Sequence, residues 1–192
     1  MSTFQNKIII ITAPSGAGKT SITRYLLETI PDKLAFSVSA TTRAARAYEK
    51  NGVDYFFLSP ESFRQNIQEN AFVEWEMVYE GKYYGTLRSE LQKTWDQGKI
   101  PLLDIDVKGA IHVKQQFPET SLSLFIEPPS VAVLRERLLS RGTETTESLE
   151  ARVNKASYEL SFKDQFDAII LNDELSKACR EALKHISSFI KQ

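Results

Sequence analysis

The 192-residue sequence has few residues of the types that cross-link small proteins through disulfides or bind structural metals. It contains one cysteine, Cys179, and its two histidines, His112 and His185, are far apart. A single cysteine forms no intramolecular disulfide and no cysteine-cluster zinc site, so a structural metal is not expected. The fold should instead depend on a hydrophobic core, because a chain of this length buries on the order of 70% of its unfolded surface.

Long hydrophobic runs and an excess of one charge are also missing. The longest aliphatic run, Ile8 to Ile11, is much shorter than the roughly 20 residues of a membrane span and too short for the core of a signal peptide. The 24 lysines and arginines balance the 25 aspartates and glutamates, which argues against general nucleic-acid binding but leaves room for local basic patches. We expect a cytoplasmic protein with neither a membrane nor a nucleic-acid partner.

Apolar strand patterns alternate with helical patterns along most of the chain. Each strand pattern is short, apolar and separated from the next by segments with helical spacing. The predicted strands are 7–12, 101–105, 122–126 and 168–171, and the predicted helices are 19–30, 87–97, 107–117, 130–141, 149–162 and 174–191. This order predicts an α/β fold with a parallel sheet covered by helices on both faces.

Two stretches interrupt the alternation. Between about residues 36 and 86 the segments become short, with strand patterns at 36–39, 55–58 and 72–78 and a helix at 60–69 that Ser59 would cap. The polar stretch 142–148 is flanked by arginines and is a candidate mobile lid. We therefore predict a core of about residues 1–35, 87–136 and 153–192, a small mixed α/β insert of about 36–86, and a lid of about 137–152.

A glycine-rich loop joins the first predicted strand to the first predicted helix. It matches the P-loop pattern G-x-x-x-x-G-K-[ST] at every defined position but the first, where Ala13 replaces glycine, and this indicates a fold of the P-loop NTPase type. Such a loop turns its N–H groups inward around phosphate oxygens beside a helix N-terminus. Lys19 would reach the β- and γ-phosphates of a nucleotide, and the Thr20 hydroxyl would bind Mg²⁺. The predicted nucleotide-binding residues of the loop are Ala13, Pro14, Ser15, Gly16, Ala17, Gly18, Lys19 and Thr20.

Two aspartates, Asp104 and Asp106, stand at the carboxyl end of the strand predicted at 101–105. Ligands of open α/β sheets bind at this edge, and a carboxylate near a P-loop can hold Mg²⁺ directly or through water, or orient a nucleotide. Alternation along the strand places both side chains on the same side. We predict that at least one is functional, with Asp104 as a magnesium ligand, although Asp106 is also suited to cap the helix at 107–117.

Two groups of arginines are candidates for binding phosphate. Arg43 and Arg46 follow a run of hydroxyl residues, and guanidinium forks with hydroxyl donors suit a phosphate dianion. Taken alone, however, arginines in loops are usually only solvated. Arg137 and Arg141 share a helix face, and Arg152 lies beyond the candidate lid. Cations on a closing segment would stabilise charge in phosphoryl transfer, whereas the simpler alternative is a surface face paired with nearby glutamates.

Taken together, these features resemble the guanylate kinase family. The resemblance rests on the P-loop and on the blocks at 37–57 (SVSATTRAARAYEKNGVDYFF), 74–75 (EW), 81–86 (GKYYGT), 103–106 (LDID) and 141–145 (RGTET), which occur in the family's order. It covers about residues 7–190. It implies a GMP-binding insert, an arginine-bearing lid, and transfer of a phosphoryl group from ATP to GMP, and by extension dGMP, with Mg²⁺.

The resemblance leaves three questions open. A monomer and a homodimer are both compatible with it. A module that binds a protein partner and has lost catalysis is an alternative from another class, and a kinase for another nucleoside monophosphate is a nearer one.

The chain also departs from the family pattern at Ala13, at Ala45 and Ala47, where the family often has prolines, and in an extra residue within 78–80. None of these departures removes a charged or hydrogen-bonding group.

The resemblance also assigns roles to individual residues. Guanine presents N1–H and N2–H₂ donors that one carboxylate accepts together, and adenine lacks both, so a buried carboxylate would discriminate between them. The implied guanine contacts are Glu74, Thr86 and Asp106, and the implied contacts to the phosphate of GMP are Ser39, Arg43, Arg46, Tyr55 and Tyr84. The implied ATP-side residues outside the loop are Arg137, Arg141, Arg152 and Asn172, and the implied catalytic set is Lys19, Arg43, Arg137, Arg141 and Arg152.

Overall fold

The computed structural model describes residues 6–140 and 146–192. Within these residues, five strands form a central sheet in the order β2-β7-β1-β8-β9, and every neighbouring pair is parallel. The strands are β1 (Ile8–Thr12), β2 (Leu34–Phe36), β7 (Ile100–Asp104), β8 (Ser121–Glu127) and β9 (Ala168–Leu171). The predicted parallel sheet is therefore confirmed.

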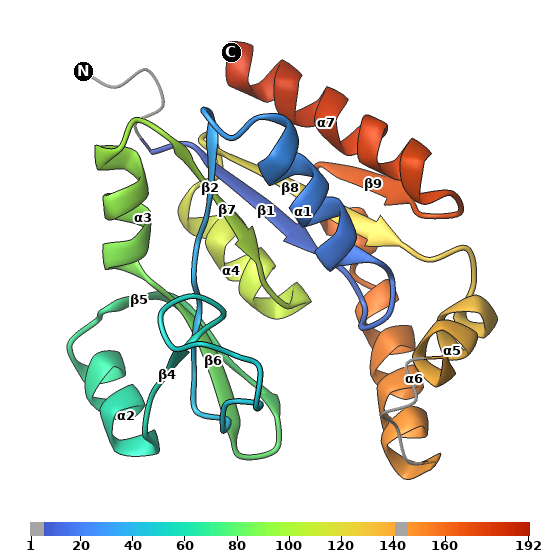
Figure 1. Cartoon of the computed structure of the whole chain (residues 1–192), viewed down its shortest axis with the longest axis horizontal. Helices are drawn as coiled ribbons and strands as arrows, with labels where there is room; N and C mark the ends of the chain where they lie inside the picture. Colours follow the sequence, from blue (N-terminus) through green and yellow to red (C-terminus); the bar gives the residue numbers. More distant parts are fainter. Residues whose placement is uncertain (1–5, 141–145) are drawn as a thin grey trace.

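Helices cover both faces of this sheet (Figure 1). One face is covered by α1 (Lys19–Thr29) and α7 (Leu175–Lys191), which also pack against each other. The opposite face is covered by α3 (Arg88–Asp96) and α4 (Val107–Gln116). This two-sided cover is the arrangement that the alternation of strand and helix patterns predicts.

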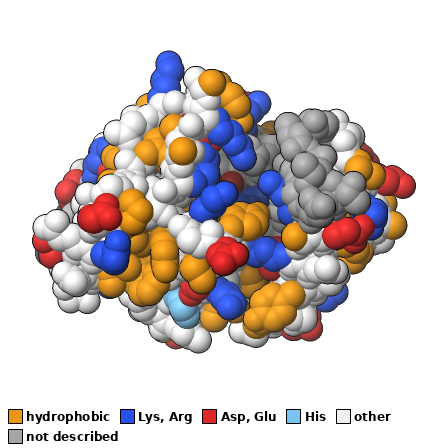
Figure 2. Space-filling view, turned by 90° about the horizontal axis from the view of Figure 1, so that it is seen from below, with side chains coloured by type: hydrophobic (Ala, Val, Ile, Leu, Met, Phe, Trp, Pro, Cys, Tyr) orange, Lys and Arg blue, Asp and Glu red, His pale blue; other side chains and the backbone are white. Residues whose placement is uncertain are grey.

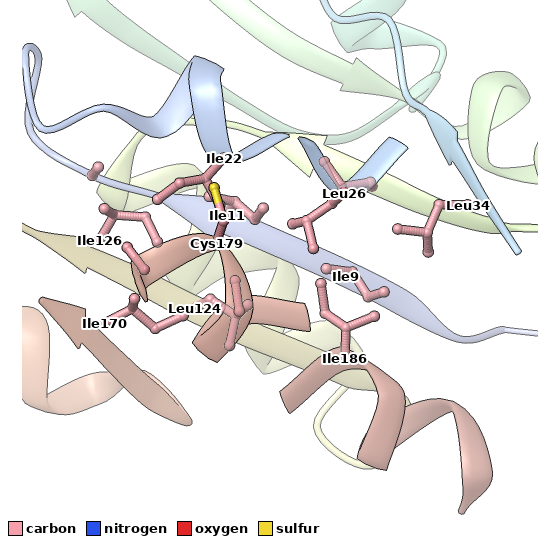
Figure 3. Close-up of a cluster of buried hydrophobic side chains, with 14 of the residues drawn as sticks. Ile9, Ile11, Ile22, Leu26, Leu34, Leu124, Ile126, Ile170, Cys179 and Ile186 are labelled. Atoms are coloured by element: carbon pink, nitrogen blue, oxygen red, sulfur yellow. The ribbon is translucent and has the colours of Figure 1, made fainter. Parts of the chain in front are cut away.

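The isoleucine run of β1 lies at the centre of the core. All five residues of β1 are buried. Ile9 and Ile11 pack with α1 and α7, and Figure 3 shows them among apolar side chains of those helices, whereas Ile8 and Ile10 belong to the cluster under α3 and α4. A strand that is buried on both faces has no polar side for alternation, which is why the sequence is apolar at four successive positions.

A second, smaller sheet forms the insert. Its strand order is β4-β3-β6-β5, and only the β3–β4 pair is parallel. The elements are β3 (Ala40–Thr41), β4 (Phe56–Phe57), α2 (Pro60–Gln68), β5 (Phe72–Tyr79) and β6 (Lys82–Leu87). The Ser59 hydroxyl accepts a hydrogen bond from the Ser62 N–H, which confirms the predicted N-cap of α2. Phe63 of α2 stacks on Phe72 at 4.5 Å between ring centroids and anchors the helix to the sheet.

The beginning of the insert differs from the prediction. A strand pattern was expected at 36–39, but β2 ends at Phe36 and belongs to the central sheet, where it pairs with β7 from Leu34↔Ile100 to Phe36↔Leu102. Leu34 is 2% exposed, so burial against the core fixes this short strand. The strand β6, which forms a hairpin with β5, was not predicted from the sequence.

The region of the predicted lid contains two helices, α5 (Val131–Leu139) and α6 (Thr146–Leu160). They pack through a small apolar cluster around Leu134, Leu138 and Leu149. α5 begins one residue later than predicted because Ser130 is its N-cap and accepts the Val133 N–H. The prediction for Arg141 and residues 142–145 lies outside the described residues. After α6, a short 3₁₀ helix, η1 (Lys163–Gln165), leads into β9.

No helix in residues 6–140 and 146–192 combines the length and the apolar character that crossing a membrane requires.

Candidate active site

A cleft of about 340 Å³ opens at the carboxyl ends of the central strands, between the insert and α6. Its walls come from four segments that are far apart in the sequence: the P-loop, the insert, the end of β7 and the inner face of α6. Figure 2 shows lysine and arginine side chains gathered in the middle of the face seen from below. The lining residues that bear charge are Lys19, Arg43, Arg46, Glu49, Glu74, Asp104, Asp106, Arg152, Lys155 and Glu159.

The P-loop connects β1 to α1, and its two glycines have the conformations that the pattern requires. Gly16 has φ 92° and Gly18 has φ 97°, both in the left-handed region that strains other residues. A Cβ on Gly18 would also collide with the side-chain amide of Asn172. Ala13 is not among the described residues with positive φ, so its position makes no demand for glycine. The loop geometry therefore tolerates the one departure from the motif.

Asn172, at the end of β9, supports the P-loop from behind. Its amide Nδ2 donates to the Ala17 carbonyl oxygen at 2.7 Å, and the residue is 4% exposed. The carbonyl of Asn172 in turn accepts from Nη2 of Arg137 at 3.0 Å. Asn172 therefore contacts the loop and Arg137 contacts Asn172, although neither residue lines the cleft itself.

Lys19 begins α1 and is ion-paired with Oδ1 of Asp104 at the end of β7. Burial lowers the pKa of Lys19 from 10.5 to about 8, although the nearby carboxylates of Glu159 and Asp106 favour its charged form. Thr20, the next residue, also lines the cleft. The structure thus brings the P-loop cation, a hydroxyl and a strand-end carboxylate together, as the sequence predicts.

Across the cleft, the insert supplies a cluster of two arginines and two tyrosines. The rings of Tyr55 and Tyr84 meet edge to face at 6.0 Å, and the guanidinium carbon of Arg43 lies 4.9 Å from the centroid of Tyr55. Burial raises the pKa of Tyr55. Ser39 is 7% exposed and lines the same wall, as does Arg46. All five residues predicted to contact the phosphate of GMP therefore share one wall.

Glu74 and Thr86 lie on neighbouring strands, β5 and β6, as a cross-strand pair. The Thr86 hydroxyl donates to Oε1 of Glu74 at 2.6 Å, and the two residues are 6% and 0% exposed. Burial raises the pKa of Glu74 from 4.5 to about 7, and the Asp106 carboxylate acts in the same direction. A Cβ on Gly109 of α4 would lie 2.5 Å from Oε2 of Glu74, so the glycine makes room for this carboxylate.

Asp106 combines the two roles considered for it. Its carboxylate accepts from the Gly109 N–H at 3.1 Å and caps α4, and the residue also lines the cleft beside Glu74. On the other side, Nη1 of Arg152 on α6 lies 3.3 Å from Oγ of Ser15. The structure thus brings Arg152 to the P-loop, the side of the cleft to which the resemblance assigns ATP, whereas Arg141 is outside the described residues.

Three charged residues of the cleft were not predicted. Glu49 pairs with Arg43, and Lys155 and Glu159 pair with each other at 3.5 Å on α6. The Lys155 ammonium also donates to the Val78 carbonyl at 3.0 Å and so links α6 to the insert. Burial raises the pKa of Glu159, which is 6% exposed. The spacing 152, 155 and 159 places these α6 residues on one helix face, which is a signal that the sequence does contain.

Comparisons with known proteins agree with this geometry. The chain matches the family model described as guanylate kinase over residues 5–191. It is 49% identical over 188 residues to the guanylate kinase of Bacteroides fragilis, an alignment that covers 98% of this chain and 92% of that protein. It is 50% identical over 183 residues to the guanylate kinase of Salinibacter ruber, with coverage of 95% and 96%.

The fold is shared as well. The crystal structure of guanylate kinase from Anaplasma phagocytophilum matches with a TM-score of 0.79 at 29% sequence identity, and the match covers 100% of this chain and 90% of that one. The family model and both relatives extend over nearly the whole chain, including the P-loop, the insert and α6. This chain therefore belongs to the guanylate kinase family and has the P-loop NTPase fold.

Proposed function

We propose that this chain is a guanylate kinase, an enzyme of purine nucleotide metabolism that transfers the γ-phosphoryl group of ATP to GMP and gives ADP and GDP. The observation that carries the proposal is the content of one cleft: a P-loop on one wall, and on the opposite wall arginines beside a buried carboxylate–hydroxyl pair. The first wall suits the phosphates of a donor nucleotide. The second suits a guanine nucleotide as acceptor.

On the donor side, the backbone of residues 13–18 and Lys19 hold the phosphates of ATP. Lys19 is paired with Asp104, and the greater charge of the phosphates would compete for its ammonium group. Arg152, which lines the cleft, stabilises the charge that spreads over the transferred group. Arg137 lies outside the cleft lining and is proposed for the same role from the resemblance. Arg141 is proposed for the same role from the resemblance alone.

On the acceptor side, Glu74 accepts the N1–H and N2–H₂ donors of guanine, and the Thr86 hydroxyl lies beside it. Asp106 lies at the same end of the pocket. Arg43 and Arg46, with the hydroxyl groups of the same wall, hold the phosphate of GMP. No general base is required, because the attacking oxygen belongs to a phosphate that is already anionic. We expect dGMP to be accepted as well.

We further propose that Mg²⁺ accompanies ATP. The Thr20 hydroxyl and the Asp104 carboxylate are oxygen donors beside the P-loop, and Mg²⁺ prefers such donors together with waters and phosphate oxygens. No cluster of three or more histidine, cysteine, aspartate or glutamate side chains suited to a metal occurs in the described part of the chain. This fits an ion that is bound mainly by the nucleotide. When bound, Mg²⁺ would neutralise charge on the β- and γ-phosphates.

Closure of the insert and the lid over the two substrates is part of the proposal, because transfer between phosphates requires exclusion of water. A distance between spin labels on the exposed faces of α2 and α7 should shorten when both nucleotides bind. An unchanged distance would contradict closure. For the setting of the reaction, we propose the cytoplasm, and we expect a monomer or a homodimer.

The test is ADP release from ATP and Mg²⁺ with GMP, AMP, UMP or CMP as acceptor, for wild type and Lys19→Ala. Lys184→Ala, at an exposed position on α7, is the matched control. We expect turnover that is selective for GMP, is lost in Lys19→Ala and is kept in Lys184→Ala. Binding of GMP without turnover would identify a binding module instead, and faster turnover with another acceptor would identify a different nucleoside monophosphate kinase.

A further inference from the structure

Arg43, whose guanidinium group lies over the ring of Tyr55, is held by a carboxylate from its own loop. Nη1 of Arg43 lies 2.7 Å from Oε2 of Glu49, and Nη2 lies 2.6 Å from Oε1. Both side chains are largely withdrawn from solvent, with 13% and 6% of their surface exposed. This is a bidentate ion pair of the geometry that fixes the plane of a guanidinium group.

We propose that Glu49 is a positioning residue for the acceptor phosphate: it orients Arg43 so that one defined edge of the guanidinium group is presented to GMP. The inference rests on the proposed function, since it requires Arg43 to meet the phosphate. Glu49 would not touch the substrate. It would act through the two arginines to which it is bonded.

A count of donors shows which edge Glu49 leaves for the ligand. Nη1 of Arg43 donates to Glu49 and to the Ala44 carbonyl, at 2.7 and 2.9 Å, so both of its hydrogens are used. Nη2 donates one hydrogen to Glu49. The second hydrogen of Nη2 and the Nε–H form the side edge of the guanidinium group, which Glu49 does not use, and the Tyr55 hydroxyl is a further hydrogen-bond partner of Arg43. A phosphate can take this edge with two parallel hydrogen bonds while Glu49 keeps the end edge.

The rings behind Arg43 support the same orientation. Its guanidinium carbon lies 4.9 Å from the centroid of Tyr55 and 5.5 Å from that of Phe57. Contacts with ring faces restrain the height and tilt of the guanidinium plane but leave rotation within the plane open. The two oxygens of Glu49 remove that rotation. A free arginine side chain would lose this freedom only when GMP binds, and the loss would weaken binding.

Glu49 also fixes the second arginine. Its Oε2 accepts the backbone N–H of Arg46 at 2.8 Å, and the Glu49 N–H donates to the Arg46 carbonyl at 3.0 Å. These bonds close the short turn between the arginines. One carboxylate thus ties together Arg43, by its side chain, and Arg46, by its backbone.

The pair stays charged at any pH at which the enzyme would work. The hydrogen bonds from Arg43 lower the pKa of Glu49 to about 2, and the Glu49 carboxylate raises the pKa of Arg43. The opposing effect is that Glu49 adds a negative charge near the phosphate of GMP. If repulsion by this charge outweighed the benefit of orienting Arg43, removal of the Glu49 charge would tighten GMP binding. If orientation dominates, the same change would weaken GMP binding.

The experiment is calorimetric titration of GMP and of guanosine into wild type and Glu49→Gln. Glutamine keeps the size of the side chain but loses the second charged acceptor. We expect the affinity for GMP to fall about tenfold and the affinity for guanosine to change less than twofold, since guanosine has no phosphate. Glu61→Gln is the matched control, because Glu61 lies in the same insert on the exposed surface of α2, and its affinities should equal those of wild type.

A double-mutant cycle with Arg43→Gln tests whether Glu49 acts through Arg43. In that background, Glu49→Gln should weaken GMP binding less than twofold. The proposal is overturned if Glu49→Gln binds GMP as tightly as wild type or more tightly, if it loses guanosine affinity equally, or if its effect is the same in both backgrounds. A wild type that binds GMP with this dependence but forms no GDP would instead refute only the proposed function.

Discussion

The buried carboxylate of Glu74 provides the most quantitative prediction, because its substitution should improve stability while it removes acceptor binding. Glu74 is 6% exposed, and apart from Thr86 no described residue donates a side-chain hydrogen bond to it. Burial therefore disfavours its charged form and raises its pKa to about 7. Glu74→Gln keeps the oxygen that accepts from Thr86 and removes the charge.

The magnitude follows from linkage. The pKa of this carboxyl group is raised from 4.5 in the unfolded chain to about 7 in the folded protein. The neutral group therefore contributes stability that is fully present below pH 4.5 and is lost as the pH rises through 7. At 1.36 kcal/mol per pKa unit, the loss is about 3 kcal/mol in total. Relative to wild type, Glu74→Gln should therefore gain about 3 kcal/mol of unfolding free energy between pH 4 and pH 8. The other titrating groups are the same in both proteins, so their contributions cancel in the difference between the two unfolding free energies.

Binding should change in the opposite sense. Glutamine presents an amide donor where guanine also presents donors, so the loss of charge-assisted bonds worth about 2–3 kcal/mol should weaken guanosine and GMP roughly 100-fold. In wild type, guanosine binding should weaken as the pH falls below about 7, where Glu74 takes up a proton. Guanosine is the better probe, because the phosphate of GMP itself titrates near pH 6.

Urea denaturation at pH 4, 6 and 8 and calorimetric titration with guanosine test these expectations. A stability difference that does not change with pH would show that Glu74 is not a buried acid of raised pKa. Undiminished guanosine binding by Glu74→Gln would show that Glu74 is not the acceptor for guanine. Either result would refute the reasoning that connects burial to specificity.

Three further predictions concern the neighbours of the two binding walls. Gly109→Ala should raise KM for GMP about tenfold with little change in KM for ATP, because the new Cβ would displace Glu74; equal KM values for GMP would contradict this packing. Gly18→Ala should lower the unfolding free energy by about 1–3 kcal/mol through backbone strain and collision with Asn172, and an unchanged thermal midpoint would argue against it. Lys155→Met should remove the hydrogen bond from α6 to the insert and lengthen the label distance between α2 and α6 in the nucleotide-free enzyme, whereas an identical distance would show that this contact does not hold the cleft.

Much of the central fold could be predicted, because its signals are local. The four isoleucines before the P-loop are apolar on both faces of β1, and the glycines and Lys19 of the loop have a fixed spacing. By contrast, β2 has three residues and β6 carries Gly85 between a tyrosine and a threonine. Neither has a clear alternation, because each is defined by the strand beside it. Local patterns predict such strands poorly.

The candidate site likewise combines residues that could be predicted from local sequence patterns with residues that could not. Most of the predicted residues that fall within the described chain line one cleft, since the P-loop and the strand ends converge at one edge of the sheet, whereas Arg137 and Asn172 lie outside its lining. Glu49 could not be assigned in advance, because a glutamate in a charged loop is usually solvated. For Glu159, the sequence shows only that it shares a helix face with Arg152 and Lys155, and not that this face lines a cleft. Only the fold shows that Arg43 and Lys155 face them.

The central claim is that the P-loop delivers the γ-phosphoryl group of ATP to GMP, and label transfer tests it most directly. ATP carrying ³²P in the γ-position would be incubated with GMP, Mg²⁺ and wild type or Lys19→Ala, and the products separated. The account predicts label in the β-phosphate of GDP in proportion to the ADP formed, with almost none for Lys19→Ala. Label that stays in ATP, or appears as inorganic phosphate whether or not GMP is present, would contradict it.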